Sequence, residues 1–166
     1  MGFQTSVNQY QAPAVAGDLL NDNPVVYHDG TGIAGANGVV AGKFVWLTLT
    51  DGQYVGSSIG KGDGTKPNGI VQRVQRAYNY DVASEATMTI GKGQAFSTVV
   101  DGEIAVVCTT AATVGQSIYV NEETGAITSN AAGQVAEHVL ETPYKVYSLL
   151  GNASEANQLV GISKRL

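Results

Sequence analysis

Residues 43–55 have the sequence KFVWLTLTDGQYV, and this stretch decides the class of fold. The residues before Asp51-Gly52 are mostly β-branched, aromatic or aliphatic, a composition that favours β-strands. The Asp51-Gly52 pair supplies positive φ at little cost, which a tight turn between two strands requires. Residues 53–55 then return to a strand-like composition. The stretch therefore predicts a β-hairpin.

Turns of the same chemistry recur along the chain. Five more Asx-Gly pairs occur, at residues 29–30, 37–38, 63–64, 68–69 and 101–102. The last of them lies between AFSTVV (95–100) and EIAVVC (103–108) and predicts a second hairpin. Two further strand pairs are predicted, 117–120 with 126–128 and 144–150 with 159–162.

Helix signals are weak by comparison. Val71, Val74 and Tyr78 have helical spacing, but Gly69 and the β-branched content favour a strand at least as much. Short strands at roughly ten-residue spacing, separated by glycine turns, are typical of all-β domains. We therefore predict an all-β fold, an antiparallel β-sandwich or barrel, with a jelly roll among the arrangements this includes.

The first 24 residues differ in character from the rest. They hold Gln and Asn with isolated apolar side chains, and Pro13 and Pro24 interrupt any regular element. We expect an extended N-terminal arm over residues 1–24 and a single β domain over residues 25–166. An arm ordered on a partner explains the isolated apolar side chains, which a purely solvated tail does not need. A partly disordered tail is the alternative.

Composition and charge argue against several classes of partner. The 166 residues are 43% hydrophobic and only 14% charged, against about 25% charged in an average protein. The net charge is −5 and the nine Lys and Arg residues are scattered, so we expect no nucleic-acid binding. No apolar run approaches the roughly 18 residues of a membrane helix, and residues 1–5 have neither the positive start nor the apolar core of a signal peptide. We expect no membrane contact, and Cys108, the single cysteine, is predicted to be a buried apolar residue.

Several enzyme-like patterns occur in unsuitable surroundings. Residues 30–35 fit G-x-G-x-x-G, but no helix is predicted to follow them and bind a pyrophosphate. Residues 56–60 fit G-x-S-x-G, but a loop follows where a nucleophile elbow needs a helix. His28, His138 and Cys108 lie too far apart in the sequence for metal-ligand spacing, and the pair at 122–123 is expected to be solvated. We predict no catalytic residue, no cofactor and no metal site.

Because we predict no catalytic, cofactor or metal site, we expect the surface side chains to contact other proteins. Eight tyrosines stand against three phenylalanines and one tryptophan, a balance that suits interfaces because tyrosine joins a rigid apolar ring to a polar tip. For each tyrosine outside the clearest strands, burial in the core is an equal alternative. The candidate interface residues are Phe3, Val7, Tyr10, Val15, Leu19, Leu20, Tyr27, Tyr78 and Tyr80.

Seven segments follow one another in the order of a known family. They are QAPAVAGD (11–18), NP (23–24), GKFVW (42–46), GIVQR (69–73), VGQSIYV (114–120), TGAI (124–127) and LVGIS (159–163). Together, over nearly the whole chain, they resemble the capsid cement, or head decoration, proteins of tailed bacteriophages. Residues 27–41 depart most from the pattern.

The resemblance implies a structural protein that acts by binding alone. It implies a compact β-sandwich or barrel with an N-terminal arm, made in the cytoplasm of a host bacterium and placed on the outer surface of the virion head. The partner would be the phage major capsid protein, and the chain itself would form oligomers, with a trimer favoured. Its role would be to stabilise contacts between major capsid subunits against the pressure of packaged DNA.

Two other functions stay open at this point. One is a carbohydrate- or receptor-binding β module of a phage tail or cell surface, which expects exposed aromatics gathered on one face. The other is a small hydrolase, for which Ser58 and His138 would both be required. For the cement protein, we expect deletion of residues 1–18 to leave a folded core that no longer holds the capsid lattice.

Overall fold

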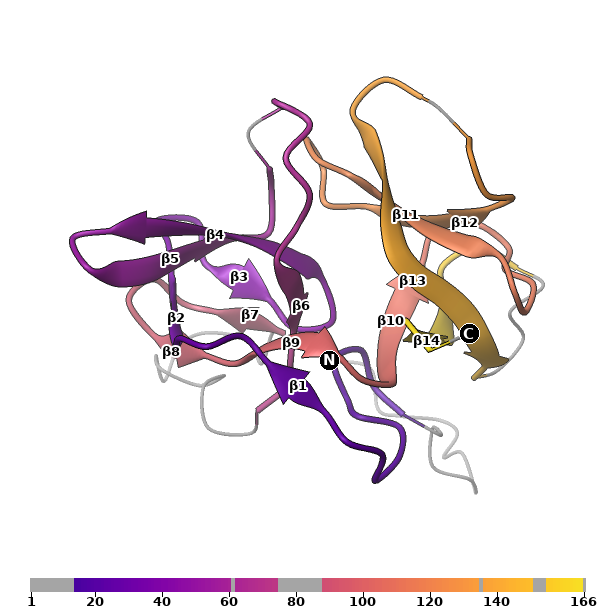
Figure 1. Ribbon diagram of the computed structural model, residues 1–166, viewed down its shortest axis with the longest axis horizontal. Coiled ribbons are helices and arrows are strands. Elements are labelled where there is room, and N and C mark those ends of the chain that lie inside the picture. Colours follow the sequence, from indigo (N-terminus) through magenta and orange to yellow (C-terminus); the bar gives the residue numbers. More distant parts are fainter. Residues whose placement is uncertain (1–13, 61, 75–87, 135, 151–154, 166) are drawn as a thin grey trace, which may run out of the picture.

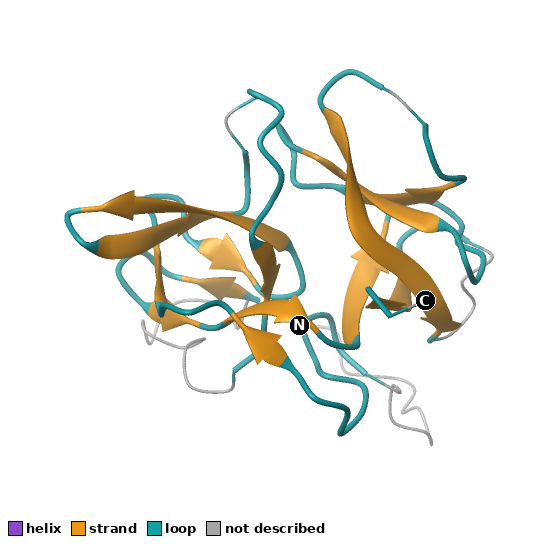
Figure 2. Cartoon of the chain, in the orientation of Figure 1, coloured by secondary structure: helices purple, strands orange, loops and turns teal. Residues whose placement is uncertain are grey.

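The computed structural model describes residues 14–60, 62–74, 88–134, 136–150 and 155–165. These residues form strands and loops without a helix (Figures 1 and 2), so none of them forms a helix that could cross a membrane. The strands are β1 (Val26–Tyr27), β2 (Gly32–Ala34), β3 (Val39–Val40), β4 (Phe44–Thr50), β5 (Gln53–Ser57), β6 (Gly69–Val71), β7 (Thr89–Ile90), β8 (Ala95–Phe96), β9 (Thr98–Asp101), β10 (Ile104–Cys108), β11 (Ser117–Asn121), β12 (Ile127–Asn130), β13 (Val139–Leu149) and β14 (Gln158–Ser163).

The described residues form two larger sheets and one small sheet. The first has seven strands in the order β1-β9-β6-β4-β5-β2-β8, and the second has five in the order β10-β14-β13-β11-β12. The third is the pair β3-β7. The two larger sheets lie side by side in Figure 1 in a sandwich-like arrangement. The predicted all-β fold is confirmed; among the described strands, every pair is antiparallel except β2 with β5, which is parallel.

Three of the four predicted strand pairs are confirmed. β4 and β5 form the hairpin of residues 43–55, with Thr50 opposite Gln53. Asp51 and Gly52 in its turn have φ values of 50° and 78°, which is the conformation that an Asx-Gly pair allows. β11 pairs with β12 and β13 with β14, as the turn residues between them predict.

The predicted hairpin at 95–108 is wrong. β9 pairs with β1 and β6 in the seven-stranded sheet, whereas β10 pairs with β14 in the five-stranded sheet. The Asp101-Gly102 pair is therefore the point where the chain passes from one large sheet to the other. Gly102 has a φ of 153°, which is more extended than a tight turn. An Asx-Gly pair permits a turn, but the pairing partners decide whether the strands on either side of it meet.

Strand β13 begins before its predicted range of 144–150 and contains a proline in its middle. Pro143 has no N–H to give to a neighbouring strand. The register between β11 and β13 shifts between Ser117 and Tyr119, opposite this proline. The Thr142 hydroxyl donates to the Ile118 carbonyl at 2.7 Å, so a side chain supplies a bond across the irregularity.

In the first three residues of β4, side chains on both faces of the seven-stranded sheet are buried. Phe44 and Trp46 belong to the larger core cluster, which also holds β10, β11 and β14 side chains of the five-stranded sheet. Val45 belongs to a second cluster with Val39 and Ile90 of the β3-β7 pair. Cys108 is fully buried in the larger cluster, as predicted. The larger cluster thus holds the two main sheets together.

Candidate functional site

The described chain begins with a tight turn that spans Val15–Asp18. The Asp18 N–H donates to the Val15 carbonyl at 3.0 Å, and the Val15 N–H donates to the Asp18 carboxylate at 2.9 Å. Gly17, near the end of the turn, has a φ of 89°, a backbone conformation that residues with a Cβ rarely adopt. The turn reverses the chain just before it reaches the five-stranded sheet.

Gly17 joins this turn to both large sheets. Its N–H donates to the carbonyl of Ala105 in β10 at 2.7 Å, and its carbonyl accepts from the N–H of Arg73, just after β6, at 2.9 Å. The Arg73 guanidinium also forms an ion pair with Asp18 at 3.1 Å. A Cβ added at Gly17 would lie 2.9 Å from the backbone nitrogens of Arg73 and Gly42. The turn is therefore fixed between the two sheets.

The residues that follow the turn cover part of the outer edge of β10. The Ala105 N–H donates to the Asp18 carbonyl at 2.9 Å, and the Leu20 N–H donates to the Glu103 carbonyl at 3.0 Å. The Glu103 carboxylate accepts from the side-chain amides of Asn21 and Asn23, the second at 2.9 Å. Because β10 is the end strand of its sheet, these bonds satisfy an edge that would otherwise be open.

The candidate interface residues are distributed over different environments. Val15 is 39% exposed at the turn, and Tyr27 is 42% exposed on β1, at the edge of the seven-stranded sheet. Leu19 and Leu20 are half-buried against β10 and its sheet, and Leu19 packs on the larger core cluster. Phe3, Val7, Tyr10, Tyr78 and Tyr80 lie outside the described residues. The structure thus brings Val15, Leu19 and Leu20 to one edge and places Tyr27 on another sheet.

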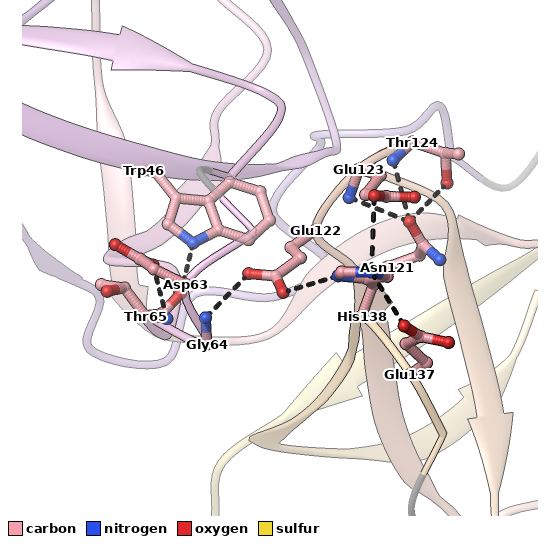
Figure 3. A network of polar contacts seen from close by, with 10 residues as sticks. All are labelled: Trp46, Asp63, Gly64, Thr65, Asn121, Glu122, Glu123, Thr124, Glu137 and His138. Atoms are coloured by element: carbon pink, nitrogen blue, oxygen red, sulfur yellow. Dashed lines mark hydrogen bonds and ion pairs between the residues drawn. The ribbon is translucent and has the colours of Figure 1, made fainter.

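A polar network joins the turn after β11 to the loop between β5 and β6 (Figure 3). The side chain of Glu122, in the turn after β11, is only 3% exposed. Its carboxylate accepts from the N–H of Gly64 at 3.2 Å and lies 3.3 Å from Nδ1 of His138. Gly64 belongs to the loop between β5 and β6 of the other large sheet. The expectation that Glu122 is solvated is therefore wrong, because a loop of the facing sheet covers it.

The same loop is fixed at two further points. The Gly60 N–H donates to the Glu122 carbonyl at 2.7 Å, and the Trp46 indole N–H donates to the Thr65 carbonyl at 2.6 Å. A Cβ at Gly60 would lie 2.9 Å from the Cβ of Glu122, so this contact between the sheets depends on a glycine. His138 Nε2 lies 3.5 Å from Glu123, whose side chain is 60% exposed, as expected for that residue.

A second contact between the sheets lies where the chain crosses at Asp101-Gly102. The hydroxyl of Tyr144 on β13 donates to the Val100 carbonyl at 2.7 Å, and its ring packs edge-on against Phe44 at 5.6 Å. Burial, with a smaller contribution from Asp101, raises the pKa of Tyr144 well above its ordinary value, so the hydroxyl stays protonated and keeps donating. Arg165 forms an ion pair with Asp101 at 3.2 Å and donates to the Pro24 carbonyl at 2.7 Å.

The enzyme-like patterns have structural roles in the described residues. Residues 30–35 contain β2, a strand, where a dinucleotide site would need a helix. The Ser57 hydroxyl donates to the Ile59 carbonyl at 2.7 Å, and Ser58 Oγ accepts from the Val40 N–H at 3.0 Å. No group of three or more His, Cys, Asp or Glu side chains within the described ranges is placed to hold a metal ion.

The sequence does not indicate which residues attach the arm and join the two large sheets. Gly17, Arg73, Glu122 and His138 lie far apart in the sequence, and their roles depend on which strands meet. The one local signal was the sequence of residues 15–18, in which a glycine precedes an acceptor side chain.

Comparison with known proteins identifies the family. The family model of the XM1 gp53 minor capsid protein matches residues 3–164. A chain in the solved structure titled "The capsid of Myoviridae Phage XM1" has the same fold, with a TM-score of 0.66 at 17% identity, covering 99% of this chain and 98% of that chain. No curated protein matches. The chain therefore belongs to the XM1 gp53 minor capsid protein family and is a structural protein of a bacteriophage capsid.

Proposed function

We propose that this chain is a cement protein that binds the outer surface of a phage head and holds neighbouring major capsid subunits together. It acts by contact alone, as an oligomer for which a trimer is favoured. The family places the chain among minor capsid proteins, and this supports the cement role over the glycan- or receptor-binding alternative. The observation that carries the proposal is the attachment of the N-terminal turn to both large sheets by hydrogen bonds and an ion pair.

This attachment divides the predicted arm of residues 1–24 into two parts. Residues 14–24 form its base, because Gly17, Asp18 and Leu20 bond to β10. We propose that residues 1–13, with Phe3, Val7 and Tyr10, reach neighbours in the head. An arm that starts from a fixed base binds with less loss of freedom than one on a flexible linker.

We expect the chain to bind the head through many weak contacts. Ordering the backbone of one residue costs about 1–2 kcal/mol, so an arm must bury apolar side chains to bind at all. Repetition on a lattice and oligomerisation then add avidity without any new contact. Val15 and Tyr27 are exposed apolar or aromatic side chains of the folded part, and we propose that they contribute to the same contacts.

The arm's role is tested by a variant that lacks residues 2–13. We expect it to keep the melting temperature of the full chain within a few degrees, because the described contacts of the base begin at Val15. We expect its affinity for purified heads to fall at least tenfold, or about 1.4 kcal/mol, measured by co-sedimentation.

Matched single substitutions sharpen this test. Tyr10→Ala removes an apolar anchor, whereas Gln9→Ala alters the polar residue beside it. We expect the first to weaken head binding and the second to leave it unchanged. Full head binding by the shortened chain would exclude the arm from the interface.

A further inference from the structure

The outer edge of β10 has a gap in its main-chain pairing. Ala105 uses both its N–H and its C=O to bind the N-terminal segment, and Thr109, just beyond the strand, donates to the Ile127 carbonyl at 2.8 Å. Successive residues of a strand point their main-chain groups to opposite sides. Val107, midway between them, therefore presents its N–H and C=O to this same edge. Among the described residues, no main-chain group pairs with it there.

An apolar groove lies beside this gap. It has a volume of about 300 Å³ and is lined chiefly by apolar side chains, among them Ala16, Val40, Ala41, Met88, Val107 and Ile127. Ala16 belongs to the N-terminal turn and Ile127 to the start of β12, the two segments that bond to β10 on either side of the gap. Val107 is 41% exposed, whereas the other four residues of β10 are fully buried.

An unpaired strand edge beside an apolar groove suits the binding of an extended peptide that carries an apolar side chain. Unpaired groups on a strand edge bind a further strand through main-chain hydrogen bonds, and a pocket beside them selects the side chain. A volume of about 300 Å³ is large enough for a side chain the size of valine or tyrosine.

The residues of the turn itself do not fill the gap. The pairing of Leu19 with Ile104 would, if continued, bring Ala16 opposite Val107. Instead, the chain turns there, and the Val15 N–H and C=O are both bonded to Asp18. The main-chain groups of Val15 are therefore bonded within the turn, and the described residues leave the edge at Val107 unpaired.

A second copy can supply the missing strand. Thirteen extended residues reach roughly 43–47 Å, whereas a compact domain of this size has a radius of gyration of about 15 Å. We propose that residues 1–13 of a second copy lie across the gap at Val107 and place Val7 or Tyr10 in the groove. This inference deepens the proposed function and rests on it, since copies on a head would be linked to one another as well as to the capsid.

The test is cross-linking between two differently tagged full-length chains in solution, without heads. Both carry Cys108→Ala; one also carries Val7→Cys or Tyr10→Cys, and the other carries Val107→Cys. With a short bismaleimide linker we expect a product joining the two tags. Val114→Cys, at a residue that is 54% exposed and outside the groove, replaces Val107→Cys as the control and should give at least tenfold less product.

Two cross-linking results would overturn the inference. One is the absence of a cross-chain product for both Val7→Cys and Tyr10→Cys. The other is a product that forms only within one chain when both cysteines are placed on it, which would assign the groove to the chain's own segment. As an independent measurement, Val107→Asp should lower the mass of the oligomer in sedimentation, whereas Val114→Asp should not. Self-association that persists with Val107→Asp would contradict the docking site, and failure to bind heads with normal cross-linking would contradict the proposed function alone.

Discussion

Gly17→Ala is expected to lower the free energy of unfolding by about 3 kcal/mol or more, one of the largest effects of any single substitution in the arm. Positive φ costs a residue with a Cβ about 1–2 kcal/mol. The new Cβ would also lie 2.9 Å from two backbone nitrogens, those of Arg73 and Gly42. Backbone atoms cannot move aside as a flexible side chain can, so overpacking adds about 1–3 kcal/mol. Urea denaturation measures the loss.

Gly52→Ala is the matched control for this prediction. Gly52 has a similar φ of 78°, but nothing lies within 4 Å of an added Cβ. It should lose only the conformational part, about 1–2 kcal/mol. Equal losses at the two positions would show that the N-terminal turn is not held between the sheets as described.

Glu122→Ala is expected to cost about 3 kcal/mol. It removes the acceptor of the Gly64 N–H and the partner of His138 in a site where the Glu122 side chain is 3% exposed. Hydrogen bonds to a charged group contribute about 1.5–3 kcal/mol, and a buried donor left without a partner adds a further penalty. Trp46 is the only tryptophan and bonds to the same loop, at Thr65. Its fluorescence therefore reports both unfolding and release of the loop.

Two control substitutions distinguish the loss of the hydrogen-bond network from the loss of a charge. Glu122→Gln keeps an oxygen acceptor of the same size and should lose roughly half as much as Glu122→Ala. Glu123→Ala, at a side chain that is 60% exposed, should change stability by less than about 0.5 kcal/mol. A Glu122→Ala variant as stable as Glu123→Ala would mean that this network does not hold the sheets together.

Local sequence predicted the strand pairs that close through short turns. Asp51-Gly52 sets the φ values of its own turn, and residues 121–125 place Asn121 to accept three hydrogen bonds from Glu123 and Thr124. The apolar composition of the flanking strands completes these predictions. Their success follows from interactions between residues that are close in the sequence.

Pairing over long sequence distances could not be predicted in the same way. Asp101-Gly102 has the chemistry of a hairpin turn, but β9 finds its partners in β1 and β6 and β10 finds its partner in β14. Glu122 has the sequence context of a solvated turn, and only the loop around Gly64 buries it. Both outcomes depend on how the two large sheets meet.

The candidate interface was predicted from composition, and the structure refines its base. Leu19 and Leu20 are isolated apolar residues in the sequence of the arm, and they lie half-buried on the domain's own edge. Val15 and Tyr27 remain exposed and available to a partner. The open edge at Val107 carries no local signal, because an apolar residue within a β-rich run gives no indication of which strand edge is unpaired.

Stabilisation of a phage head by surface contact is the function that we propose for this chain. The most direct measurement is the temperature at which DNA-filled heads that lack this chain release their DNA, with and without the purified protein added back. We predict that the full chain raises this temperature and appears as added density on the outer surface in electron microscopy, whereas the chain without residues 2–13 does neither. Heads that bind the full chain but release their DNA at an unchanged temperature would contradict the cement role.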